Sequence, residues 1–204
     1  MKRTDNYAIQ AAQAKQLYLT YDQEALIRKF RLEADEAYLY PVLLGSRCRL
    51  SRTTGDLERE KDGRWVDANS YNEVMTLLDV LCDAREDRYL TGRWRSMQDF
   101  GLMFHQNLME EGRDRHAEAY DRNPEALHRA CRALGGRPIK NADIGYAIEL
   151  FDGLEIGLLF WHGDEEFAPR LRYVWDENAR AYIRYETMHF AVGLLLTRLQ
   201  EAGD

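Results

Sequence analysis

The densest group of chemically active side chains lies in one short segment of the sequence. Its members are an aromatic ring, an imidazole and three carboxylates, namely Trp161, His162, Asp164, Glu165 and Glu166. Such groups can ligate a hard metal ion through oxygen, or exchange a proton as acid and base. The competing interpretation is a solvated corner between a strand and a loop, where Asp164 bonds backbone amides as in an Asx turn.

A second group of candidates lies in a glycine-containing loop further upstream. Thr91, Arg93 and Trp94 stand together there, and a tryptophan ring with neighbouring arginines suits an anionic or aromatic ligand. The alternative is a loop anchored by one buried tryptophan. Tyr185 and Glu186, at the start of the last predicted helix, complete the candidate ligand-binding residues.

Established catalytic and metal-binding patterns are absent from the sequence. It contains no phosphate-binding glycine loop, no nucleophile elbow, no His-Glu-x-x-His pair and no calcium loop. Glu186 and His189 have the Glu-x-x-His spacing of di-iron bundles, but the second pair that such a centre needs is missing. The sequence therefore assigns no metal ligand, no cofactor and no catalytic residue.

The strands that position the acidic segment are predicted from the hydrophobic pattern. Residues 154–161 are apolar on both faces, as expected for a central strand. A strand at 146–151 precedes it through the turn Asp152-Gly153, and a third strand is predicted at 171–175. The acidic corner therefore lies where a central strand leaves its sheet, a place where ligands often bind.

Helices flank these strands on both sides in the sequence. A polar helix is predicted at 107–120, and a second at 124–134 has the cap Asn123 in front of it. The last helix has one apolar face, formed by Met188, Ala191, Val192, Leu195 and Leu199.

The first part of the chain repeats this order of elements. Two helices come first, and Asp22 caps the second of them. Residues 38–44 and 48–50 form a predicted hairpin, followed by a charged loop over 55–63 and a short strand at 65–66. A helix closes this part, with an apolar face formed by Val74, Leu77, Leu78 and Leu81.

Several anchors align the two parts. Glu24-Ala25-Leu26 matches Glu125-Ala126-Leu127, the hairpin glycine Gly45 matches Gly153, and Gly55-Asp56-x-Glu58 matches Gly163-Asp164-x-Glu166. The spacing between matched anchors changes only in the gaps, as loop insertions require. We interpret the pattern as an internal duplication; chance agreement among common residue types is the alternative.

The predicted fold class is α+β, with two similar ααβββα halves. Their sheets are mainly antiparallel, with helices packed on one face. The first half covers residues 1–83 and the second 102–204, and residues 84–101 form a connecting loop. We expect one compact domain overall, because this length buries a large core.

Composition limits the partners of the chain. The net charge of −7 repels phosphate backbones and anionic lipid headgroups, so neither nucleic acid nor a membrane is expected as a partner. The sequence shows neither a signal peptide nor an apolar run of spanning length, and the predicted location is the cytoplasm. The three cysteines are expected to be reduced core side chains.

Four segments resemble a known family. Residues 159–167, 175–178, 185–187 and 91–94 are similar to the bacterial family catalogued as domain of unknown function 3786, and the resemblance spans nearly the whole chain. The family assigns no activity. The resemblance implies an accessory component of anaerobic metabolism; some relatives are joined to cysteine-rich iron–sulphur segments, which this chain lacks.

Three functions stay open at this level. The first is an accessory module that binds a small ligand, a cofactor or a partner protein. The second is a carboxylate- or metal-dependent enzyme that uses the corner at 163–166 for hydrolysis or proton transfer. The third is a structural interaction protein, which predicts an exposed apolar patch and no cleft.

Overall fold

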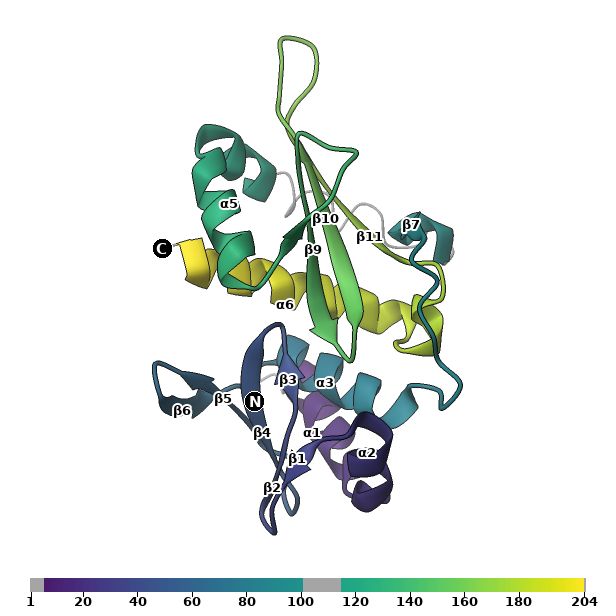
Figure 1. Ribbon diagram of the computed structural model, residues 1–204. Helices are drawn as coiled ribbons and strands as arrows, with labels where there is room; N and C mark the ends of the chain where they lie inside the picture. Colours follow the sequence, from purple (N-terminus) through teal and green to yellow (C-terminus); the bar gives the residue numbers. More distant parts are fainter. Residues whose placement is uncertain (1–5, 101–114, 204) are drawn as a thin grey trace. The chain divides into compact units, whose positions relative to one another are not determined.

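A computed structural model describes residues 6–100 and 115–203 of the chain (Figure 1). Two compact units are formed, the first by Met1–Tyr89 with Ala181–Leu194 and the second by Leu90–Arg180 with Leu195–Asp204. The chain passes from one unit to the other at Leu90, inside the segment 84–101, and the last helix contributes residues to both. Each unit combines helices with one antiparallel sheet path, which confirms the α+β class.

The first unit begins with two helices. These are α1 (Asn6–Tyr18) and α2 (Gln23–Phe30). The Asp22 carboxylate accepts a hydrogen bond from the Ala25 N–H and so caps α2, as predicted. Arg31, in the left-handed conformation, ends this helix.

The sheet of the first unit has the order β1-β2-β4-β5-β6, with β3 beside β4. Its strands are β1 (Glu33–Ala34), β2 (Tyr38–Tyr40), β3 (Val42–Leu43), β4 (Ser46–Ser51), β5 (Leu57–Lys61) and β6 (Arg64–Asp67). The helix α3 (Tyr71–Asp83) follows, and Ser70 caps it. Within this unit, α1 packs against α3.

Two predictions for this sheet are wrong in detail. The predicted strand 38–44 is divided at Pro41, which has no N–H to donate to a ladder. Most of the predicted charged loop 55–63 is the strand β5, which pairs with β4 and β6. Its Glu58 and Glu60 lie on the open face of the sheet, so the segment shows no hydrophobic signal.

The two faces of this sheet differ. Leu39, Cys48 and Leu50 are buried on the inner face. On the outer face, Arg49 stacks on the rings of Tyr38 and Trp65, and Arg47 stacks on those of Tyr40 and Trp65. We call these five outer residues the arginine–aromatic ladder.

The second unit contains the longer strands. They are β7 (Trp94–Ser96), β8 (Arg137–Pro138), β9 (Ile144–Phe151), β10 (Leu154–Trp161) and β11 (Arg170–Asp176), in the order β7-β11-β10-β9-β8. Residues 115–122 are helical. The other helical elements are the 3-10 turns η1 (Met97–Phe100) and η2 (Ala179–Ala181), the helix α5 (Pro124–Ala133), and α6 (Tyr185–Gly203), which is shared with the first unit.

Strand β10 has the predicted bounds, and α5 has the predicted cap Asn123. The segment 84–101 is not only a connecting loop, because β7 lies within it and pairs with β11. Its three residues of mixed polarity give no periodic signal, so only the pairing partner reveals this strand. The predicted helix 107–120 lies partly outside the described residues.

The predicted core is confirmed. Leu77, Leu78, Leu81, Val192 and Leu195 are all at most 4% exposed. All three cysteines are free thiols, and burial raises the pKa of Cys82 and of Cys131 to about 12.

The internal duplication stays a prediction, and the order of elements agrees with it. Gly45 and Gly153 both occupy the second position of a two-residue hairpin turn, after Leu44 and Asp152. All four residues have positive φ, as a type I′ turn requires. In each unit a two-residue strand, β1 or β8, precedes the first long hairpin and pairs with it.

Candidate functional site

The loop after β10 is closed by Asp164. Its Oδ1 accepts hydrogen bonds from the N–H groups of Glu166 at 2.8 Å and Phe167 at 2.7 Å. The Asp164 N–H in turn donates to the Phe167 carbonyl at 2.9 Å. Gly163 allows the loop to close, because a Cβ there would lie 2.8 Å from Pro169 Cδ. One oxygen of Asp164 therefore serves the architecture of the loop.

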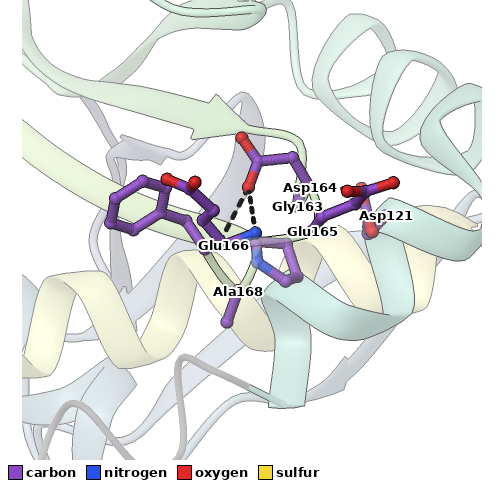
Figure 2. A pocket seen from close by; sticks show the side chains of 8 residues that line it. Asp121, Gly163, Asp164, Glu165, Glu166 and Ala168 are labelled. Atoms are coloured by element: carbon purple, nitrogen blue, oxygen red, sulfur yellow. Dashed lines mark hydrogen bonds between the residues drawn. The ribbon is translucent and has the colours of Figure 1, made fainter.

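A shallow hollow of about 530 Å³ lies at this loop (Figure 2). It is lined by Asp121 and by every residue from Gly163 to Pro169. The side-chain carboxylates of Glu165 and Glu166 make no hydrogen bond or ion pair with any other described residue, and Phe167 is 62% exposed. The hollow thus presents several carboxylates and one aromatic ring to solvent.

His162 lies immediately before this loop and bonds to one of the lining residues. Its Nδ1 is 2.8 Å from Asp121 Oδ1, and its backbone N–H donates to Asp143 Oδ2 at 2.9 Å. Asp121 Oδ1 also accepts the Gly163 N–H at 3.3 Å. The structure therefore joins His162 and the hollow through Asp121, which precedes α5 in the sequence.

Thr91 and Arg93 are tied to the end of β11. The Asp176 carboxylate accepts the N–H groups of Thr91 at 2.9 Å and Gly92 at 2.7 Å, together with the Thr91 hydroxyl. Arg93 and Arg95 form ion pairs with Glu177. These arginines already have an anionic partner, which accounts for their position without a bound ligand.

Trp94 lies in β7 and packs on the sheet. A Cβ atom at Gly157 would come within 3.2 Å of the Trp94 ring, so the ring approaches the backbone of β10 closely. This contact agrees with the anchoring interpretation of the loop. Neither Trp94 nor its neighbours line the hollow.

The remaining candidates are placed elsewhere. Trp161 is the last residue of β10, half-buried opposite Arg170, and does not line the hollow. Tyr185 and Glu186 belong to the first unit. The Tyr185 ring packs edge-on against His189, with 5.0 Å between centroids, and Glu186 is exposed.

The matching corner of the first unit is fully ion-paired. Asp56 contacts Lys15 Nζ at 2.8 Å, and Glu58 contacts Arg49 Nε at 2.6 Å. The hydrogen bonds from Lys15 and Thr54 lower the pKa of Asp56. The two corners thus differ, because Glu165 and Glu166 have no such cations among the described residues.

A second carboxylate group, which no sequence pattern indicates, lies in the first unit. Asp79 accepts a hydrogen bond from the Arg184 backbone N–H at 3.1 Å and forms an ion pair with Arg184 Nε at 3.3 Å, and Arg184 also pairs with Asp83. Thr187 donates a further hydrogen bond to Asp79. Burial raises the pKa of Asp79 from 3.8 to about 6, against the opposing effects of Thr187 and Arg184.

The residues that sequence reasoning missed share one property. The partners of Asp121, Asp176 and Asp79 are all distant in sequence. Asp121 and Asp79 also have no acidic neighbour directly beside them, whereas Asp176 is followed by Glu177. Only Asp176 had a signal, because it directly follows a predicted strand and precedes a turn. In the described ranges 6–100 and 115–203, no group of three or more His, Cys, Asp and Glu residues could hold a metal ion.

One family matches most of the chain. The model of the family described as "Domain of unknown function (DUF3786)" matches residues 22–198. The chain belongs to this family. The match includes most of both units and every candidate ligand residue, from Thr91 to Glu186. No curated protein and no solved structure matches the chain. Among the described residues, no helix of this DUF3786 protein is long and apolar enough to cross a membrane.

Proposed function

We propose that this DUF3786 protein is a binding module, an accessory protein of anaerobic metabolism rather than an enzyme with a tuned carboxylate pair. Its ligand is a small polar molecule that carries a cationic or hydrogen-bond-donating group. The observation that carries this proposal is the hollow at 163–169, whose lining carboxylates Glu165 and Glu166 are unpaired among the described residues.

The physical chemistry of the hollow favours a cation. Carboxylates lining one concave surface raise the local concentration of positive charge. The exposed ring of Phe167 adds an aromatic face, and a cation over such a ring gains about 0.5–1 kcal/mol at an exposed site. An organic amine or guanidine fits both features.

The first experiment asks whether the native protein retains a ligand. We expect native mass spectrometry and metal analysis of the purified chain to detect a bound small molecule. Titration calorimetry with putrescine and, separately, with magnesium chloride then distinguishes an organic cation from a divalent metal. The proposal is refuted if neither putrescine nor magnesium binds and if the mass spectrum shows no ligand bound to the purified chain.

Three substitutions locate the site. Glu165→Gln is nearly isosteric and removes one charge from the hollow, so we expect weaker putrescine binding and an unchanged melting temperature. Asp164→Asn tests the loop, and Glu125→Gln, at the exposed start of α5, is the control for a distant charge. If both variants instead bind putrescine as the wild type does and only have lower melting temperatures, Asp164 and Glu165 stabilise the loop and do not bind a ligand.

The alternative is the carboxylate- or metal-dependent enzyme. A metal-dependent form has less support, because Asp164 is engaged by the amides of its own loop. A form that relies on proton transfer has one specific observation in its favour, the contact between His162 and Asp121.

A further inference from the structure

The start of α6 is attached to α3 through one buried carboxyl group. Asp79 accepts the backbone N–H of Arg184, the residue directly before α6, and also contacts its Nε. Thr187, the third residue of α6, donates a further hydrogen bond to the same carboxyl. The Asp79 side chain is only 6% exposed. A single acid of α3 therefore holds both the backbone and two side chains at the beginning of the last helix.

A second carboxyl group lies directly beside the first. Asp83 stands one turn further along α3, and its carboxyl forms a hydrogen bond with that of Asp79. An ionised carboxylate has no hydrogen to donate, so this bond exists only while one of the two groups carries a proton. Arg184 contacts both acids, through Nε and through a terminal nitrogen. Full ionisation would leave the pair with one more negative charge than this shared cation supplies.

Other titratable groups face the pair from the neighbouring elements. The Tyr21 hydroxyl donates to Asp83 Oδ1 at 3.4 Å, and Cys82 lies next to Asp83 in α3. Burial raises the pKa of the Tyr21 hydroxyl, and it raises the pKa of the Cys82 thiol to about 12, so both are neutral near pH 6. The cation of Lys29 attracts Asp83, but its Nζ donates to the Ala84 carbonyl. The shared proton is therefore the charge that balances the pair.

We propose that the Asp79–Asp83 pair is a proton switch that controls how firmly the start of α6 is attached to the first unit. With one proton between them, the two carboxyls bind each other and hold Arg184. Without it, two carboxylates face each other in a largely buried place and the attachment weakens. The inference is independent of the proposed ligand site, because neither aspartate lines the hollow.

The direction of the switch follows from the burial of Asp79. Burial raises the pKa of this carboxyl from 3.8 to about 6. The folded state therefore keeps a proton between these values that the opened state releases, so the attachment is strongest at low pH and weakens as pH rises through about 6.

Other contacts keep the opening local. The Arg85 N–H donates to the Ala181 carbonyl at 2.8 Å, and the Arg88 guanidinium lies over the Tyr182 ring. Neither contact involves Asp79 or Asp83, so residues 181–182 stay bound when the proton is lost. Because α6 contributes residues to both units, the switch acts on the one helix that the two units share.

The test is amide hydrogen exchange of the intact chain, followed by NMR between pH 5 and 7.5. The reporters are the N–H groups of Arg184, which donates to Asp79, and of Met188, which donates to the Arg184 carbonyl at 3.0 Å. Exchange rates are divided by the intrinsic rate at each pH, which gives a protection factor. We expect this factor to fall about tenfold over the range, as a pKa of about 6 against 3.8 requires. The Val74 N–H of α3, bonded to the Ser70 carbonyl, should keep its protection.

Asp83→Asn is the decisive variant. The asparagine amide can donate to the Asp79 carboxylate without a titrating proton, and one of the two negative charges is gone. The protection of Arg184 and Met188 should then be the same, within about twofold, at pH 5 and at pH 7.5. Asp87→Asn is the matched control, since Asp87 is an exposed acid whose partner is Arg85, and it should keep the tenfold fall of the wild type.

Three results would overturn the proposal. The first is a protection factor of Arg184 that does not change with pH in the wild type. The second is an equal fall in the wild type and in Asp83→Asn, which would assign the titration to another group. The third is a parallel loss at Val74, which would mean that the whole unit is destabilised. Should Asp83→Asn fail to fold, the ¹³C shift of the wild-type Asp79 carboxyl decides, because a titration midpoint at the ordinary value of 3.8 excludes the switch.

Discussion

In both sheets a tryptophan of an edge strand lies over the middle strand, but the residue that it contacts there differs. Arg49 in β4 and Gly157 in β10 each stand four residues after a hairpin glycine, on the middle strand of a meander. In the first unit, Trp65 of the edge strand β6 receives the Arg49 guanidinium at 4.7 Å from its ring centroid. In the second unit, Trp94 of the edge strand β7 lies against Gly157.

This difference shows how one residue sets the character of a sheet face. An arginine on the middle strand must keep its charged group hydrated, so the tryptophan stacks on it and the face remains polar. A glycine lets the ring approach the backbone, and β10 is accordingly buried along most of its length. The arginine–aromatic ladder of the first unit and the packing of Trp94 on Gly157 in the second are therefore two ways in which an edge-strand tryptophan covers the face of its sheet.

The largest effect is expected where the two units are most alike. Leu81 and Leu195 each stand ten residues after the tyrosine that begins α3 or α6, and both are 0% exposed. Leu81→Ala and Leu195→Ala should each lower the free energy of unfolding by about 2–5 kcal/mol. Thermal melts of both variants test this, with the exposed Gln200→Ala as control. A melting temperature within a degree of wild type for either variant would show that its leucine does not belong to the packed face of that helix.

The next effect separates the two sheets. A Cβ at position 157 would lie 2.5 Å from Val174 Cγ2, so Gly157→Ala should lower the free energy of unfolding by about 1–3 kcal/mol through overpacking. Urea unfolding followed by tryptophan fluorescence measures it. An unchanged urea midpoint would mean that Trp94 and Val174 can move away from the new Cβ. This face of the second sheet would then be less rigid than its packing indicates.

The helices also differ in charge at equivalent positions. Asp79 of α3 has a buried carboxyl, and Gly193 stands at the same distance from the start of α6. The pKa of Asp79 is about 6 in the folded chain and about 3.8 without burial. Between these values the folded state holds a proton that the unfolded state releases, so the stability contributed by Asp79 falls as pH rises through this window.

Asp79→Asn should therefore remove a pH-dependent contribution of about 1–3 kcal/mol between pH 4 and 6.5. Urea midpoints across this range measure it. Asp56→Asn is a comparison of opposite sign at lower pH: the pKa of Asp56 is lowered in the fold, so its contribution to stability is lost only as pH falls below the ordinary carboxyl pKa of 3.8. Equal pH dependence of wild type and Asp79→Asn would show that Asp79 titrates normally.

The smallest effect concerns the ladder. Arg49→Ala removes the cation from between two rings and should cost about 0.5–1 kcal/mol. Glu58→Gln breaks only the ion pair of Arg49 and should cost less, since partly exposed pairs contribute little. If Glu58→Gln lowers the free energy of unfolding as much as Arg49→Ala does, the ion pair rather than the aromatic stacking stabilises the outer face of this sheet.

Much of the fold is predictable from local signals. Asp22 and Asn123 indicate the starts of α2 and α5 because capping acts within three residues. The turn Asp152-Gly153 indicates the hairpin of β9 and β10 because few residue pairs adopt its dihedral angles. Strand β5 has no such signal because its alternating side chains are charged, and a polar strand on an open face has the composition of a loop.

The candidate site divides in the same way. The sequence determined by itself that the acidic corner follows a central strand, because the apolar run and the carboxylates are contiguous. Only the tertiary structure decided that Asp121 bonds His162 across 41 residues, and that Asp176 holds Thr91 across 85 residues. Such pairs depend on how distant strands and loops are packed together, and no local periodicity records that packing.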